Sequence, residues 1–97
     1  MIIRIVKLSF KPEYINDFIQ IFKDSESLIK NFEGCQHVEL LNEINQKNIF
    51  FTYSYWRSED DLNQYRKSDL FNRVWAKTKV LFNDKPEAWS VERFGDM

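Results

Sequence analysis

The chain has 97 residues, of which 43% are hydrophobic and 16% aromatic, which is enough for one folded domain and no more. Its 14 Lys and Arg residues balance 15 Asp and Glu residues, so no strongly basic surface is expected to attract nucleic acid. The single cysteine, Cys35, excludes an internal disulfide and is typical of a protein in a reducing compartment.

The N-terminal segment shows no sign of export or membrane insertion. It lacks the apolar core of roughly 7–15 residues and the cleavage site of a signal peptide. No apolar run in the chain approaches the ~20 residues of a membrane span. We therefore expect a soluble cytoplasmic protein, folded as a single domain over residues 1–97, with no membrane or nucleic-acid partner.

The first two predicted elements are a strand and a long helix. Residues 2–10 favour a strand, because Ile2, Ile3 and Ile5 are β-branched. Pro12 suits the first turn of a helix, where its missing N–H has no cost. Apolar residues then recur at three- and four-residue spacing over residues 14–32, which predicts an amphipathic helix that ends before Gly34.

The middle of the chain predicts a hairpin, with strands at residues 35–42 and 48–56 and a polar loop at residues 43–47. Its second strand is apolar or aromatic on both faces. One face carries Ile49, Phe51, Tyr53 and Tyr55, and the other carries Phe50, Thr52, Ser54 and Trp56. A strand with one face in water alternates apolar and polar residues, so this strand needs a cover on both faces.

Two serines predict the starts of two further helices. Ser58 and Ser68 are each followed by acidic residues, which favour the positive end of a helix dipole. The first helix places Leu62 and Tyr65 on its inner side, and the second runs to about residue 83. Pro86 ends that segment, and residues 87–94 are predicted as the last strand.

The order strand, helix, strand, strand, helix, strand predicts an α+β, ferredoxin-like βαββαβ fold. Its four-stranded antiparallel sheet has helices on one face only. The bare face would be an apolar patch that monomers rarely expose. We therefore expect a homodimer in which two sheets pack face to face as a dimeric α/β barrel and bury about 2,000 Å² or more. A monomer with an exposed apolar face is the alternative.

The runs FEGCQHVELLNE and FFTYSYWRSEDDLNQYRKSDLFNRVW resemble the antibiotic-biosynthesis monooxygenase family. The resemblance covers residues 2–94 and lies in the layout, in which a strand ends in Trp56 and is followed by Ser-Glu-Asp, a short helix and Ser68-Asp69. The segment of residues 56–59 is its most specific motif. Membership implies the same fold and dimer, but the fold is shared by quinol and polyketide monooxygenases, haem-degrading enzymes and members with no known reaction.

The resemblance disfavours haem degradation. Haem-degrading relatives carry an Asn on the first strand, a Trp after the third strand and an iron-ligating His beyond it. This chain has Tyr65 at the Trp position, Trp75 at the His position, and Lys7, Leu8 and Ser9 on the first strand. Indole nitrogen only donates hydrogen bonds and cannot ligate iron as imidazole does. We expect no cofactor and no metal, because no His, Cys and carboxylate cluster has ligand spacing.

The cofactor-free monooxygenases are the better match, and they imply oxidation of a small aromatic or quinol-type ligand by molecular oxygen. Such chemistry needs an apolar cleft and a polar group that assists removal of a phenolic proton. We expect His37 and Tyr65 to be catalytic. The imidazole of His37 titrates near neutral pH and could act as the base, and the hydroxyl of Tyr65 needs a hydrogen-bond partner if it is buried. Arg66 or Arg73 would steady a phenolate. The expected substrate-binding residues are Trp56, Trp75, Arg66 and Phe71.

Two alternatives stay open. Phe71 and Trp75 lie at helical spacing with Leu70 and Val74, so packing in the core explains them as well as substrate contact does. A non-catalytic ligand-binding or stress-related module with the same dimeric barrel would use the cleft only to bind.

Overall fold

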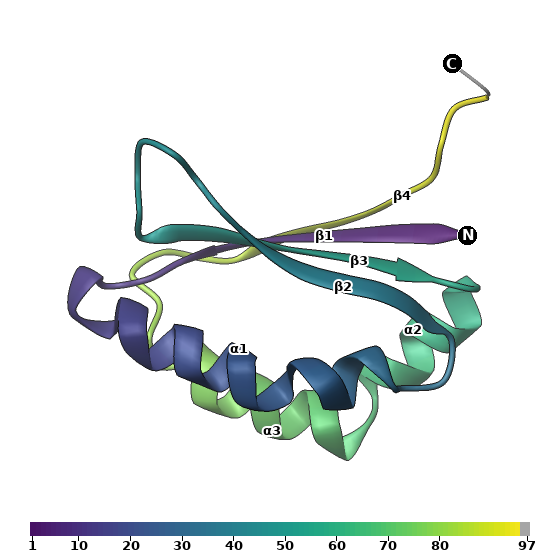
Figure 1. Ribbon diagram of the computed structural model, residues 1–97, viewed down its shortest axis with the longest axis horizontal. Coiled ribbons are helices and arrows are strands. Elements are labelled where there is room, and N and C mark those ends of the chain that lie inside the picture. The colour runs from purple at the N-terminus through teal and green to yellow at the C-terminus, as the bar shows by residue number, and fades with distance from the viewer. Residues whose placement is uncertain (96–97) are drawn as a thin grey trace.

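Four antiparallel strands form one sheet, and the helices cover a single face of it (Figure 1). The computed structural model describes residues 1–95. The strands are β1 (Ile2–Ser9), β2 (Cys35–Asn42), β3 (Ile49–Trp56) and β4 (Glu87–Val91), in the order β2-β3-β1-β4. The helices are α1 (Ile15–Lys30), α2 (Glu59–Arg66) and α3 (Asp69–Lys79), and a short 3-10 turn, η1 (Pro12–Tyr14), precedes α1. The predicted ferredoxin-like α+β fold is confirmed. Within residues 1–95, no helix has the length and apolar character that crossing a membrane requires.

Both predicted serine caps are present. The Ser58 hydroxyl accepts a hydrogen bond from the backbone N–H of Asp61 at 3.1 Å, at the start of α2. The Ser68 hydroxyl accepts one from the N–H of Phe71 at 3.1 Å, at the start of α3. Each bond satisfies an N–H group that the helix itself cannot pair, so the two caps fix where α2 and α3 begin.

Two elements end at least three residues earlier than the sequence predicts. The α3 helix ends at Lys79 instead of near residue 83, because the following backbone bonds to the start of the chain: Leu81 accepts from the N–H of Lys11 at 3.1 Å, and Asn83 donates to Ser9 at 3.0 Å. The β4 strand ends at Val91 instead of residue 94, because Val91 pairs with Ile3, where the partner strand β1 begins.

The helix-facing side of the sheet changes from large to small side chains along the strands. At one end Phe10 is fully buried, and its ring stacks on Phe18 with centroids 4.2 Å apart. Leu8 pairs there with Phe50. Farther along β1, the cross-strand neighbours are small: Val6 pairs with Thr52 and Ala88, and Arg4 pairs with Ser54 and Ser90. The large end is closely packed, and the small end leaves space under the helices.

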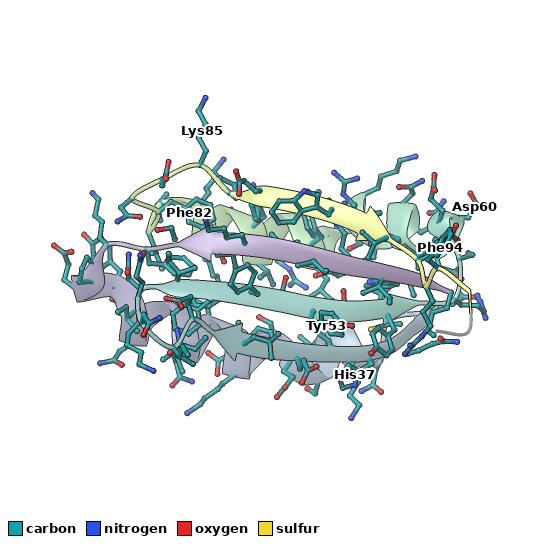
Figure 2. All side chains as sticks on the ribbon, turned by 90° about the horizontal axis from the view of Figure 1, so that it is seen from above. His37, Tyr53, Asp60, Phe82, Lys85 and Phe94 are labelled. Atoms are coloured by element: carbon teal, nitrogen blue, oxygen red, sulfur yellow. The ribbon has the colours of Figure 1, made fainter. Side chains whose placement is uncertain are left out.

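The opposite face of the sheet carries the other half of the alternating residues and no helix (Figure 2). Tyr53 and Tyr55 lie on it with ring centroids 5.3 Å apart. In the single chain, the side chains of Trp89 and Val91 are 45% and 41% exposed. The predicted two-faced character of β3 is therefore present, with helices over one face and an apolar, accessible surface on the other.

Gly34 connects α1 to β2 in a conformation that favours glycine. Its φ angle is +87°, in the left-handed region, and a Cβ atom built there would overlap the Asp61 side chain. Asp61 is held in place by Arg57, whose Nε lies 2.8 Å from its Oδ2. The glycine therefore lets the α1–β2 turn approach the start of α2.

We predict that Gly34→Ala lowers the free energy of unfolding by about 1–3 kcal/mol, because it adds both a strained φ angle and a steric overlap. Urea denaturation of the two proteins measures the difference. Gly95→Ala is the control, since Gly95 also has a positive φ of +67° but has open space where its Cβ would be. A loss at Gly34 no larger than the loss at Gly95 would contradict the steric argument.

Candidate functional site

A cavity of about 380 Å³ lies between the sheet and the helices, at the end where the sheet carries small side chains. Residues of all four strands line it from the sheet side, and residues of all three helices line it from the other side. Its volume is in the range that small-molecule sites in proteins occupy.

One wall of the cavity is a row of aromatic rings from three elements. Trp56 of β3 stacks on Tyr65 of α2, with centroids 4.9 Å apart. Tyr65 meets Phe71 of α3 edge to face at 5.3 Å, and Phe71 is parallel to Trp75 at 5.9 Å. All four residues line the cavity. A continuous aromatic wall of this kind offers a planar apolar ring large contact area and favourable ring geometry.

Some polar groups of the lining are already bonded within the protein. The indole Nε1 of the buried Trp56 donates to the Ser54 hydroxyl at 3.0 Å. The Thr78 hydroxyl donates to the backbone carbonyl of Val74 at 2.7 Å. These bonds hold side chains in place, and they leave the recognition of a polar ligand mainly to Tyr65 and to the arginines of the lining.

The Tyr65 hydroxyl loses its proton less readily than an ordinary tyrosine hydroxyl does. Burial raises the pKa of Tyr65 well above the usual tyrosine value, and the nearby Cys35 side chain adds a smaller effect in the same direction. The hydroxyl therefore stays protonated at neutral pH. It is suited to donate a hydrogen bond to a ligand oxygen and unsuited to accept a proton as a base.

Arg4 is a lining residue that the sequence reasoning missed. It lies on β1, is half-buried, and donates from Nη1 to the Ser90 hydroxyl at 3.0 Å. Burial lowers the pKa of Arg4, and the positive charge of Arg66 lowers it further. The signal in the sequence was a charged residue on the same face of the first strand as Val6 and Leu8.

The structure brings together most of the predicted site residues. Trp56, Tyr65, Arg66, Phe71 and Trp75 all line the one cavity. The exposed Arg73 is absent from this lining and borders a separate shallow depression on α3 with Asp69. The aromatic rings therefore serve as packing partners of one another and as the wall of the cavity at the same time.

His37 is not brought to the cavity. The next residue along β2, Val38, lines the cavity, so the alternation of side chains turns His37 to the opposite face of the sheet (Figure 2). There its Nε2 lies 3.4 Å from an oxygen of Glu39, and its ring centroid lies 5.3 Å from that of Tyr55. The sheet separates the two residues that the sequence predicted as catalytic.

The family model described as antibiotic biosynthesis monooxygenase matches residues 1–77, which include everything from β1 through most of α3. The chain belongs to this family. The match includes α1, α2 and the four aromatic residues of the cavity wall, while β4 lies outside it.

Two curated relatives match most of this chain but only a small part of their own length. A protein of Haloarcula marismortui with the name "Putative heme-binding protein" is 30% identical over 76 residues, which cover 78% of this chain and 11% of the relative. A protein of Natronomonas pharaonis with the same descriptive name is 25% identical and is covered over 13% of its length. The chain thus spans roughly a tenth of the length of these curated relatives.

Two solved structures show how widely the family fold is shared. A conserved protein from Methanosarcina mazei superposes with a TM-score of 0.90 at 23% identity, over 97% of this chain and 94% of that protein. A structure described as an antibiotic biosynthesis monooxygenase gives a TM-score of 0.91 at 14% identity, over 97% of this chain and 99% of the other. Because both sequence identities are below 25%, these two superpositions establish the fold alone.

We predict that Tyr65 makes the protein less stable at high pH. An unfolded tyrosine ionises near pH ~10, whereas the buried Tyr65 does not, so its contribution to stability is complete below pH ~10 and is lost as the pH rises toward the native pKa. Between about pH 10 and pH 11 this amounts to about 1 kcal/mol. Urea denaturation of wild type and Tyr65→Phe over this range measures it. The variant should lose less stability, and parallel declines would contradict the prediction.

Proposed function

We propose that the chain is a cofactor-independent monooxygenase that oxidises a small aromatic or quinol-type substrate with molecular oxygen. The observation that carries the proposal is the aromatic-walled cavity, with a neutral hydrogen-bond donor, Tyr65, and a cation, Arg66, in its lining. Family membership supports the same class of reaction. The alternative is a non-catalytic module that binds an aromatic ligand in this cavity.

Each lining group has a role in the proposed reaction. The substrate ring packs against Trp56, Phe71 and Trp75, which orient it and exclude water from one face. The positive charge of Arg66 favours the phenolate over the phenol, and the Tyr65 hydroxyl donates a hydrogen bond to the same oxygen. Arg66 is exposed to solvent, so the phenolic proton leaves to water at that side of the cavity.

The electron balance of the reaction needs no external reductant. The electron-rich anion passes an electron to oxygen, and the two resulting radicals combine at a ring carbon. For a ring CH₂ group activated by the phenolate, one oxygen atom becomes the new carbonyl, and the other leaves as water with the two hydrogen atoms. The substrate carbon loses four electrons and molecular oxygen gains four.

Haem is a second candidate ligand of the cavity, because the Haloarcula relative is named for haem binding. Haem iron in proteins is held by His, Cys, Met or Tyr. Within residues 1–95, the cavity lining includes no His, Cys or Met, and its tyrosine is Tyr65. Burial opposes ionisation of that tyrosine, and ionisation is what iron ligation by a phenolate requires. The residues present do not fit an axially ligated haem.

We predict oxygen uptake when the protein is mixed with members of a panel of quinols and anthrones, followed with an oxygen electrode. Tyr65→Phe and Arg66→Gln should each lower kcat by about tenfold or more, because each removes a group that stabilises the anion. Lys77→Gln is the matched control, since Lys77 is an exposed cation on α3 that does not line the cavity. Mass spectrometry of the product after labelling with heavy oxygen should find one labelled atom.

Other outcomes of this experiment count against the oxygenase. Tight binding of aromatic ligands with no oxygen uptake from any member of the panel would support the binding module. Uptake that is unchanged in both Tyr65→Phe and Arg66→Gln would place the reaction outside the cavity.

We also propose that the chain works as a homodimer through the helix-free face of the sheet. Ile5, Phe51 and Tyr53 lie on this face, because their neighbours along β1 and β3 face the helices. The edge strand β4 adds Trp89 and Val91, both more than 40% exposed in the single chain. A second copy of the same sheet is the simplest cover, since a twofold axis brings each apolar row against its own equivalent.

We predict a particle of twice 11.8 kDa by gel filtration with light scattering at micromolar concentration. Tyr53→Glu should dissociate it, because a charge at the centre of the proposed interface would be buried without a partner. Leu28→Glu is the control, since Leu28 is 55% exposed on α1, on the helical side of the molecule. A wild-type particle of 11.8 kDa would contradict the proposed dimer.

A further inference from the structure

We infer that the ligand of the cavity carries a carboxylate in addition to its aromatic body, and that Arg4 and Arg66 hold this carboxylate. The inference deepens the proposed function by naming the substrate class, a hydroxyaromatic acid, and it rests on the same cavity. The supporting observation is that the cavity lining contains two guanidinium groups, those of Arg4 and Arg66, and no acidic side chain among the described residues.

Arg4 lies on the central strand β1, between Ser54 of β3 and Ser90 of β4. The Ser90 hydroxyl accepts from its Nη1 at 3.0 Å, and Ser54 instead accepts from the indole of Trp56. These short neighbours leave room beside the guanidinium. Within residues 1–95, the hydrogen bonds of the Arg4 side chain reach Ser90 alone, so several of its five donors remain for a ligand.

Arg4 and Arg66 are the charged side chains of the cavity lining within the described part of the chain, and no Asp or Glu joins them. The ion pairs formed by residues 1–95 lie elsewhere, two on Arg57 and one between His37 and Glu39. Two cations near one another, one of them half-buried, repel and lose hydration. An anionic ligand group would supply the countercharge that the protein does not.

Guanidinium groups present paired N–H donors that match the two oxygens of a carboxylate, and such bidentate pairs are among the strongest polar contacts in proteins. A phenolate oxygen alone would engage Arg66 and leave Arg4 without a counterion. In a hydroxyaromatic acid whose carboxylate is next to its hydroxyl, the carboxylate can accept from Arg4 and from Arg66 while the adjacent phenolate oxygen still lies against the charge of Arg66.

Beyond the two arginines, the cavity lining is mostly apolar. Leu8 lies four residues beyond Arg4 on the same face of β1, about 13 Å away along the strand. Leu8, Phe18 and Phe22 form the apolar end of the cavity, and the aromatic wall runs along its side. A ligand with its charge at Arg4 and a fused aromatic body toward Leu8 would match both ends.

The test compares two ligands of the same shape, 2-naphthoic acid and its uncharged amide, by isothermal titration calorimetry. We expect the wild-type protein to bind the acid at least about tenfold more tightly at low salt, and the preference to shrink as ionic strength rises. Arg4→Gln and Arg66→Gln should each weaken acid binding by about tenfold and leave amide binding unchanged. The double variant should bind the two ligands equally, and Lys77→Gln should behave as wild type.

Several results would overturn the inference. They are equal binding of acid and amide by the wild type, no binding of either, or a preference for the acid that survives in the double variant. Arg66→Gln changes an exposed side chain, so it tests the inference even if Arg4→Gln fails to fold. Arg4→Lys keeps the charge and should retain part of the preference for the acid.

A parallel oxygen-uptake assay separates this inference from the proposed oxygenase. It compares a dihydroxynaphthalene with its carboxylic acid derivative. Selective binding of 2-naphthoic acid without oxygen uptake would contradict the proposed oxygenase and support the carboxylate site. The opposite result is oxygen uptake with the same kcat/KM for both dihydroxynaphthalenes, in wild type and in Arg4→Gln. It would contradict the carboxylate site and support the oxygenase.

Discussion

The structure depends on a step in side-chain size along the helix-facing side of the sheet. Leu8, Phe10 and Phe50 fill the space under α1 at one end, and the rows around Val6 and Arg4 leave it open at the other. The cavity of about 380 Å³ at that end is partly open to solvent, because the exposed Arg66 belongs to its lining. The lining combines aromatic rings with the guanidinium groups of Arg4 and Arg66, so it suits water that a ligand would displace.

The strand β3 serves two surfaces at once, and this is possible because its side chains alternate. Thr52, Ser54 and Trp56 line the cavity, whereas Tyr53 and Tyr55 face the helix-free side. The single sheet thus separates the cavity of the proposed reaction, on one face, from the proposed dimer contact, on the other face. A residue one position along the same strand acts on the other surface, so substitutions in β3 can separate ligand binding from assembly. The two proposals can fail independently for the same reason.

Much of this arrangement follows from local patterns in the sequence. The serine caps, the glycine before β2 and the two-faced β3 depend on neighbouring residues, and each is found where the pattern predicts it. The ends of α3 and β4 depend on backbone bonds to β1, which no local pattern contains. The prediction that His37 lies in the cavity was wrong, because side chains alternate along β2 and Val38 takes the cavity side. A register shift between Cys35 and His37 interrupts this alternation near the start of the strand. Arg4 becomes a site residue only when β4 and α2 are placed beside it, which takes the tertiary structure.

The chemistry available in the cavity is that of stabilising an anion instead of creating one. Within the described lining there is no imidazole and no carboxylate, and burial keeps the Tyr65 hydroxyl protonated. The arginines add positive charge in a partly dry space, where each 1.4 kcal/mol of preference for the anion lowers the pKa of a bound phenol by about one unit. With water as the proton acceptor, a weakly acidic quinol would reach the anionic form only as far as the two arginines lower its pKa. A more acidic phenol would depend on them less. The cavity would therefore select its substrates by acidity as well as by shape.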